Sequence, residues 1–225
     1  MNKLFLFIIT LFLVFGSLIA EDKESVALTI KIKGDIILTR DNNESKVSQG
    51  EPLYDLDVLK SKEDSYAAIK FIDGNSLVKL FPNSILEIKA EKKEQGLNKK
   101  SILKMGELWA KVTGQIGSFE LETPTTVVSV KGTKFLLSVE ESGHTTLYAF
   151  SGIVEIANKL DDNRSEVNPG EMAVSSGEGE ILVQTYELDQ LDEEIQEYLE
   201  ETSETMMIEL ENEEGEVKKI RIELE

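Results

Sequence analysis

Residues 65–84 read SYAAIKFIDGNSLVKLFPNS. Two runs with alternating apolar side chains, Tyr66–Ile72 and Ser76–Phe81, lie on either side of Asp73-Gly74-Asn75. An Asp-Gly pair between two such runs is typical of a tight β-turn, because glycine tolerates the positive φ angle that the turn requires. This stretch therefore predicts a β-hairpin.

The same pattern extends along most of the chain, from about residue 26 to 184. No window of this region has a sustained helical period, and glycine, proline or asparagine stands at many of the gaps. Short runs that recur in this way predict an all-β fold, either a sandwich or roll of jelly-roll type or, alternatively, a β-helix. The further runs are Ala27–Ile32, Ile36–Leu38, Ile85–Ile88, Ser101–Leu103, Leu108–Val112, Phe119–Thr123, Val127–Val130, Phe135–Val139, Thr145–Ala149, Ile153–Ile156, Met172–Val174 and Ile181–Thr185. The lysine-rich stretch Ala90–Lys100 interrupts them, and we expect it to be an exposed loop.

The N-terminus has the layout of a secretory signal peptide. Lys3 gives a basic start, the segment Leu4–Ala20 carries no charge, and acidic residues follow from Glu21. Ala20 suits the position before the cleavage site. An uncleaved anchor is the alternative, since the apolar segment is at the lower limit of a bilayer span. Both interpretations predict export, to the periplasm or the medium in the first case and to an inner-membrane anchor in the second.

Composition excludes several classes of function. The chain of 225 residues has 24 Lys+Arg, 43 Asp+Glu, one His and no Cys, with a net charge of −19. Such a charge disfavours nucleic acids and anionic membrane surfaces as partners. Without cysteine there is no disulfide, thiolate zinc site or cysteine nucleophile. No nucleophile-elbow, zinc-protease or P-loop motif is present, and the single His144 is expected in an exposed turn. We therefore expect neither catalysis, nor a cofactor, nor a metal site.

The pattern changes after residue 185. Four apolar residues, Leu188, Leu191, Ile195 and Leu199, follow helical spacing among acidic residues. Two strands are then predicted, Met206–Glu211 and Val217–Leu224. Residues 186–225 hold 16 acidic and 3 basic residues, a net charge of −13. We expect the apolar stripe to pack against the β-domain, with docking to a partner as the alternative. The predicted domains are a signal peptide (1–20), a β-domain (21–185) and an acidic helix–hairpin extension (186–225).

The order of the turns resembles the FecR-type domain over about residues 28–180. The resemblance lies in Thr123-Pro124, then VKGTKF at 130–135, then Gly152-Ile153-Val154, and a closing Gly170, after the hairpin around Gly74. It implies an all-β, non-enzymatic, extracytoplasmic module. In founding members of the family, that module transmits a signal from an outer-membrane receptor to a sigma factor. Since only three residues precede the apolar segment, we expect no anti-sigma segment here.

The residues that carry the resemblance are interpreted as structural. Gly74, Gly132, Gly152 and Gly170 are expected to supply a positive φ angle or a close backbone approach at turns. Pro124 keeps the preceding residue extended and interrupts strand pairing.

Taken as a whole, the sequence predicts an exported, non-catalytic module that binds a protein or another component of the cell envelope. A component of a cell-surface signalling pathway is the first alternative. A carbohydrate-active enzyme that uses two carboxylates is the second. The identity of the partner and the oligomeric state are left open.

Cleavage of the signal peptide is directly testable. We expect mass spectrometry of the protein isolated from its native cell to find an N-terminus at Glu21. Recovery of a chain that retains Leu4–Ala20 would instead establish the anchored form.

Overall fold

The computed structural model describes residues 24–187 except 95, 115, 116 and 177, then residues 189, 191, 193 and 196, and the backbone of 205–211 and 217–223. The predicted signal peptide lies outside these residues, as does most of the predicted helix. Within the described part of the chain, we find no helix with the length and apolar character needed to cross a membrane.

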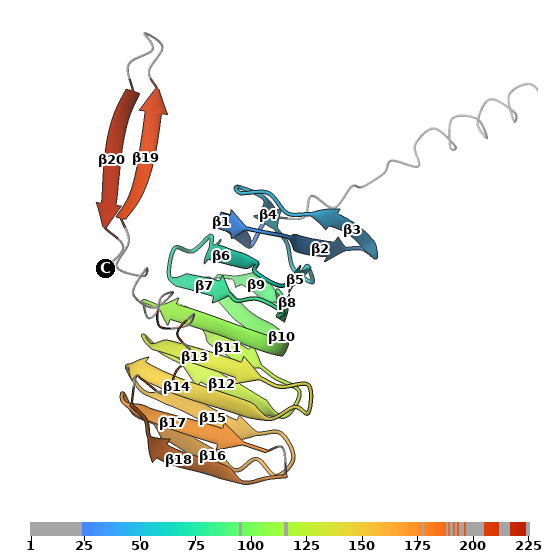
Figure 1. The fold of residues 1–225 in the computed structure, drawn as a ribbon, viewed down its shortest axis with the longest axis vertical. Coiled ribbons are helices and arrows are strands. Elements are labelled where there is room, and N and C mark those ends of the chain that lie inside the picture. Colours follow the sequence, from blue (N-terminus) through green and yellow to red (C-terminus); the bar gives the residue numbers. More distant parts are fainter. Residues whose placement is uncertain are drawn as a thin grey trace, which may run out of the picture.

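The described residues form β-strands almost throughout (Figure 1), which confirms the all-β prediction. The strands of the main body are β1 (Ala27–Lys33), β2 (Ile36–Arg40), β3 (Asn43–Lys46), β4 (Pro52–Leu53), β5 (Val58–Ser61), β6 (Tyr66–Phe71), β7 (Ser76–Leu80), β8 (Ile85–Glu87), β9 (Ala90–Lys93), β10 (Gly96–Val112), β11 (Phe119–Glu122), β12 (Thr126–Val130), β13 (Lys134–Val139), β14 (Thr145–Ser151), β15 (Val154–Asn158), β16 (Arg164–Val167), β17 (Glu171–Ser175) and β18 (Ile181–Thr185).

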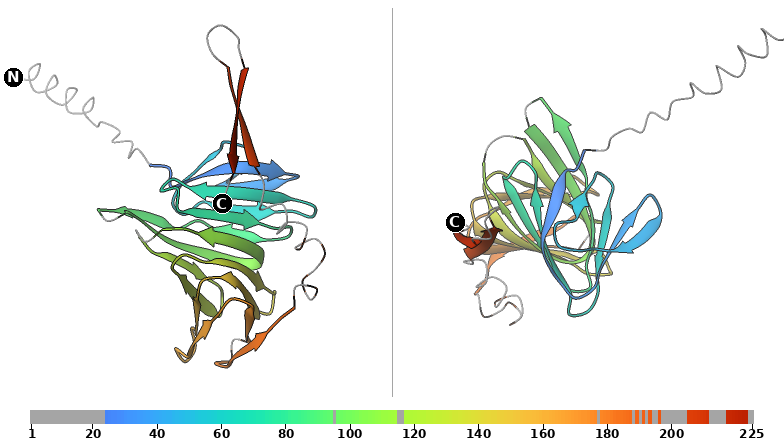
Figure 2. Two further views of the ribbon diagram at one scale, coloured as in Figure 1. Left: turned by 90° about the vertical axis from the view of Figure 1, so that its left-hand side faces the viewer. Right: turned by 90° about the horizontal axis from the view of Figure 1, so that it is seen from above.

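The strands pair in two layers that share β10. Layer I has the order β4-β1-β6-β7-β10-β13-β14-β17-β18. Layer II has the order β3-β2-β5-β8-β10-β11-β12-β15-β16, with β9 beside the first residues of β10. Strands later in the sequence therefore lie, with few exceptions, further along the stack that the two layers form. The view along this stack shows both layers curling around a common interior (Figure 2).

Two antiparallel layers that curl around one interior agree with the predicted sandwich or roll, but the connectivity is neither that of a jelly roll nor that of a β-helix. Among the described pairs only β10–β11 is parallel, whereas the coils of a β-helix would pair in parallel. The sequential strand order also lacks the long crossings of a jelly roll. The chain places hairpins alternately in the two layers, because each tight turn returns the chain to its own layer.

The central core lies between the layers and follows from the alternation in the sequence. Every second residue of β12 is buried, for example, while the residues between face outward. Three rings form a chain through this core: Phe71 contacts Phe119 and Phe119 contacts Phe135, each pair edge-on with centroids 6.3 Å apart. Phe135 is fully buried and thus fills part of the core.

A second apolar cluster covers the outer face of layer I. It contains Tyr66, Ala68, Leu77, Phe81, Trp109, Leu136 and Leu191. Leu191 comes from the acidic extension and is only 5% exposed, so at this residue the extension packs against the β-domain. Tyr186 adds edge-on ring contacts to Tyr148 and Phe150, at 5.2 and 6.2 Å. Leu188, Ile195 and Leu199 lie outside the described residues.

The prediction of a loop at Ala90–Lys100 is wrong. These residues form β9 and the start of β10. Leu97 and Lys99 are buried and their neighbours face outward, as in any half-buried strand. The ammonium group of Lys99 forms an ion pair with Asp73 and lies 5.9 Å from the centre of the Phe71 ring. Lys99 stands where the alternating pattern of a strand would have an apolar residue, so the strand was not recognised in the sequence. Its charge can be buried because Asp73, distant in the sequence, neutralises it.

The prediction of two C-terminal strands, Met206–Glu211 and Val217–Leu224, is confirmed. β19 (Thr205–Glu211) and β20 (Val217–Glu223) pair in antiparallel orientation, with Thr205 opposite Glu223 and Glu211 opposite Val217.

The glycines of the FecR-like turns all have positive φ angles: 74° at Gly74, 71° at Gly132 and Gly152, and 84° at Gly170. Two of these turns also touch. A Cβ atom on Gly152 would lie 2.4 Å from the carbonyl oxygen of Gly132, whereas a Cβ atom on Gly132 would meet no atom within 4 Å. Position 152 therefore requires glycine for two reasons: its positive φ angle and its close contact with the turn at Gly132.

These two glycines make a matched pair for a stability test. We expect Gly132→Ala to lower the free energy of unfolding by about 1–2 kcal/mol, the cost of a left-handed conformation for a residue with a Cβ atom. Gly152→Ala should lower the free energy of unfolding by a further ~1–3 kcal/mol, because the added Cβ atom would also displace the backbone at Gly132. Equal urea midpoints for the two variants would contradict the contact.

Candidate functional site

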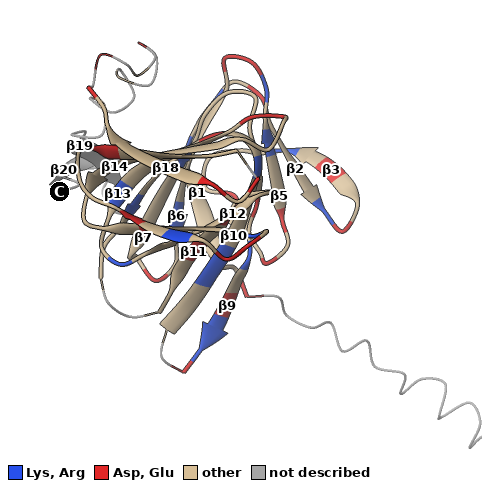
Figure 3. Cartoon of the chain, turned by 90° about the horizontal axis from the view of Figure 1, so that it is seen from below, with Lys and Arg blue, Asp and Glu red and all other residues tan. Residues whose placement is uncertain are grey.

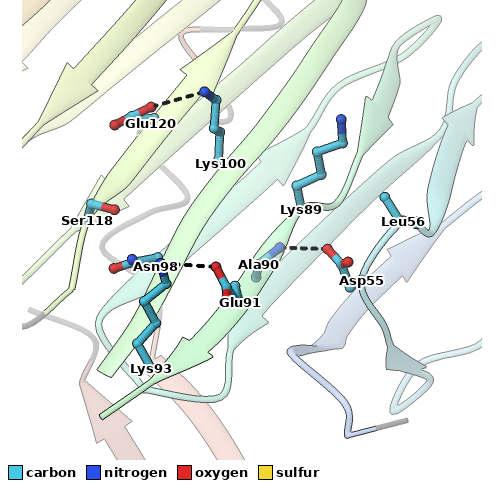
Figure 4. Close-up of a pocket in the computed structure, with 10 residues that line it drawn as sticks. All are labelled: Asp55, Leu56, Lys89, Ala90, Glu91, Lys93, Asn98, Lys100, Ser118 and Glu120. Atoms are coloured by element: carbon cyan, nitrogen blue, oxygen red, sulfur yellow. Dashed lines mark hydrogen bonds and ion pairs between the residues drawn. The ribbon is translucent and has the colours of Figure 1, made fainter. Parts of the chain in front are cut away.

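The outer face of layer II carries a groove made of two adjoining hollows. The first has a volume of about 350 Å³ and lies between the loop at 55–56, β9, β10 and β11 (Figure 4). The second has a volume of about 490 Å³ and lies between β11, β12, β15 and β16. Ser118 and Glu120 line both hollows, so the two lie side by side, and we refer to them together as the groove.

The groove crosses the strands rather than running along them. From β10 to β16 it spans β11, β12 and β15, each paired with the next. Four strand spacings correspond to about 19 Å, the length of roughly six residues of an extended chain. The site is therefore sized for a polypeptide segment rather than for a small metabolite.

An exposed leucine in an unusual conformation marks the first end of the groove. Leu56 is 61% exposed and has a φ angle of 69°, which side chains with a Cβ atom rarely adopt. Its N–H donates to the carbonyl oxygen of Ile88 at 2.8 Å, and the N–H of Asp57 donates to the carbonyl oxygen of Tyr54 at 3.2 Å. The turn thus holds an apolar side chain in water at the wall of the hollow.

Two carboxylates fix this turn to its surroundings. Asp57 is buried and accepts two hydrogen bonds from the guanidinium of Arg40, at 2.8 and 2.7 Å. Asp55 accepts a hydrogen bond from the backbone N–H of Ala90 at 3.0 Å. Both acidic groups therefore support the conformation of Leu56.

An exposed isoleucine marks the other end. Ile153 is 53% exposed and lines the second hollow, directly after Gly152 in the turn between β14 and β15. The sequence predicted this residue as part of a strand, but β15 begins one residue later, at Val154. The groove consequently has an exposed aliphatic side chain at each end.

Charges are distributed unevenly along the groove. Lys89, Lys93 and Lys100 line the first hollow, and Figure 3 shows the lysines gathered on β9 and the adjacent part of β10. Glu155 and Glu166 line the second hollow together with one lysine, Lys131. Asp55, Glu91 and Glu120 also line the first hollow, so its charges are balanced, whereas the second hollow has an excess of carboxylates.

Ion pairs, some between strands and one within β9, hold many of these side chains in place. Lys100 lies 3.0 Å from Glu122 and 3.8 Å from Glu120, and Lys93 lies 3.2 Å from Glu91. Glu122 also accepts a hydrogen bond from Lys159 at 2.7 Å. Opposite charges on neighbouring strands stabilise the sheet modestly and preorganise its polar surface.

The pKa values reflect this pairing. A hydrogen bond from Lys104 lowers the pKa of Glu87, although burial acts against it. Burial raises the pKa of Glu122, but hydrogen bonds from Lys159 and Lys100 together outweigh this and lower it. Both carboxylates are therefore ionised at neutral pH. A general acid at pH 7 requires the opposite shift, so these two groups are suited to recognition rather than to proton transfer.

The other residues singled out from the sequence either shape turns beside the groove or lie elsewhere in the fold. Gly132 and Gly152 shape the turns that carry Lys131 and Ile153, whereas Gly74, Pro124 and Gly170 lie in other turns. His144 is half-exposed in a turn, 3.5 Å from Glu140. In the described part of the chain, no three His, Asp or Glu residues are grouped so as to hold a metal ion.

Pro124 lies at a corner that joins the layers. The hydroxyl of the preceding Thr123 lies within hydrogen-bond distance of the hydroxyls of Thr126, at 2.9 Å, and Thr145, at 3.0 Å. Because Thr126 begins β12 in layer II and Thr145 begins β14 in layer I, these three hydroxyls connect the two layers.

Comparison with known proteins supports the fold and the family. Residues 57–155 match the family model described as FecR protein, so this part of the chain is a FecR-like domain. Two crystal structures of a proposed anti-sigma factor from Parabacteroides distasonis are similar, each with a TM-score of 0.52 and 16% identity. The match covers 67% of this chain and 66% of that one, and the likeness is one of fold. Comparison with curated proteins gives no match.

The ion pairs of layer II make stability depend on pH. Since the pKa of Glu122 is lowered in the folded protein, its contribution is present above its ordinary value of 4.5 and is lost as the pH falls below it. We expect the free energy of unfolding to fall less between pH 5 and about pH 3 in Glu122→Gln than in the natural protein. Exposed Glu166→Gln serves as the control. Parallel pH profiles for all three proteins would contradict the role of these pairs.

Proposed function

We propose that this protein is an exported, non-catalytic recognition module of a signal-transduction system, and that its groove receives an extended segment of a protein partner. The FecR domain supports the class of function, since the family's founding members transmit signals outside the cytoplasm. The uncharged segment Leu4–Ala20 supports export. The groove itself, with its two exposed aliphatic ends, is the observation that carries the proposal.

The form of the groove favours a peptide segment over other ligands. Leu56 and Ile153 are separated by several strands, so one small molecule would not contact both. Apolar anchors within a polar rim are typical of protein–protein interfaces. The ion pairs between them would orient the partner's backbone and side chains, because they keep the lysines and carboxylates of the groove in defined positions.

The chemistry at the two ends differs, which gives the groove a direction. A partner segment would place acidic residues near Lys93 and Lys100 and basic residues near Glu155 and Glu166. Such complementarity contributes more to specificity and to the rate of association than to affinity. We therefore expect binding to weaken as salt is raised.

Photo-crosslinking in the native cell tests the proposal. A photoreactive amino acid is placed at exposed Ser118, in the wall common to both hollows, and at Leu160, which is 73% exposed at the far end of β15. We expect a discrete adduct with one envelope protein from position 118 and none from position 160. The double variant Leu56→Ser, Ile153→Ser should reduce that adduct at least tenfold without unfolding the protein, because both side chains are exposed.

Two outcomes would contradict the groove as the binding site. One is the same set of adducts from both positions. The other is an undiminished adduct from position 118 in the double variant, with an unchanged circular-dichroism spectrum.

A further inference from the structure

Five strands of the two-layer stack lie at an edge, and four of them carry features that discourage further pairing. An open edge presents unpaired N–H and C=O groups, which natural proteins protect with charges, proline or short strands. β3 reads NESK with all four residues exposed, and β9 reads AEKK. β4 is two residues long and begins with proline, and β16 reads RSEV.

β18 differs from all of these. It reads ILVQT and contains neither a charge nor a proline. It pairs with β17 along its whole length, from Ile181 opposite Ser175 to Thr185 opposite Glu171. Among the described strands, none pairs with its other edge.

The side chains of β18 hold the strand in place without covering that edge. Ile181 and Val183 are half-buried and pack against the central core. Leu182, between them, is 54% exposed, and Gln184 is exposed on the same side of the strand. Within the described residues the other edge of β18 carries no strand pairing, although β16 of layer II lies near it. A strand anchored by one face and unpaired along one edge is preorganised to accept another strand.

Charges on both sides of β18 indicate what kind of strand would pair there. Glu178 and Glu180 precede it, Glu187 and Asp189 follow it, and all four are exposed. A second copy paired antiparallel about Val183 would bring Glu180 and Glu178 near Glu187 and Asp189 of the other molecule. Like charges at such positions oppose pairing, and the net charge of −19 on each copy adds to the repulsion.

We propose that the outer edge of β18 is a β-augmentation site for another protein, and that the segment it accepts is an apolar strand flanked by lysine or arginine. Main-chain hydrogen bonds would supply the affinity, and the flanking charges the choice of partner. This surface is distinct from the groove, so the test of one does not decide the other.

Three synthetic peptides test the proposal on the full chain. The first is Lys-Lys-Thr-Val-Thr-Val-Thr-Lys-Lys, the second replaces each lysine with glutamate, and the third replaces the central threonine of the first with proline. We expect only the first to bind in calorimetry. It should slow hydrogen exchange at the amides of residues 181–185 and leave those of the groove unchanged.

Matched variants locate the contact. Leu182→Lys should weaken binding of the first peptide at least tenfold, because it adds to the edge the charge that protects other edges. Leu160→Lys, the same change at an exposed leucine outside the strand, should leave binding unchanged. Gln184→Lys repeats the test at a second exposed position, in case Leu182→Lys disturbs the fold.

Several results would overturn the proposal. These are no binding of the first peptide, equal binding of the first and second peptides, or equal effects of Leu182→Lys and Leu160→Lys. A concentration-dependent dimer in sedimentation that protects residues 181–185 would assign the edge to a second copy instead.

Discussion

The whole body depends on one strand, β10, which is hydrogen-bonded in both layers. Its first part pairs with β8, β9 and β11, and its second part with β7 and β13. The strand passes from one layer to the other near Gly106, where a Cβ atom would lie 2.2 Å from the hydroxyl oxygen of Ser84. The hydroxyl of Ser84 accepts the N–H of Glu107 at 2.8 Å and closes this crossing. The buried ion pair between Lys99 and Asp73 ties the first part of β10 to the hairpin of layer I.

A stack built in this way exposes surfaces of different kinds. The outer face of layer I is apolar and is partly covered by the chain's own extension, through Leu191 and Tyr186. The outer face of layer II is polar, with cross-strand ion pairs around the groove. The end of the stack presents β18, which carries no charge and, among the described strands, pairs only with β17. Our two proposals accordingly place recognition on layer II and at the end of the stack, whereas layer I uses its apolar face for packing.

The FecR-like turns shape the corners of the fold. Gly132 and Gly152 approach each other closely, and the hydroxyl of Thr123 connects the layers at the corner beside Pro124. These residues shape corners and are constrained by backbone geometry. Of the groove residues, Ile153 follows Gly152 at such a corner and Leu56 lies in a separate turn at 54–57, and both side chains are exposed, so the fold does not depend on packing of either one.

The sequence by itself determined most of the strands, the hairpin at Gly74, the FecR-like domain and the positive φ angles of its glycines, because alternation and turn chemistry are local properties. Only the tertiary structure decided the rest. Lys99 is a core residue because Asp73, distant in the sequence, neutralises it, and Leu56 is exposed because Arg40 and Ala90 hold its turn. The pairing of β10 with both layers, which creates the groove, also joins residues that no local pattern relates. Burial and exposure depend on such distant partners, and the sequence alone does not name them.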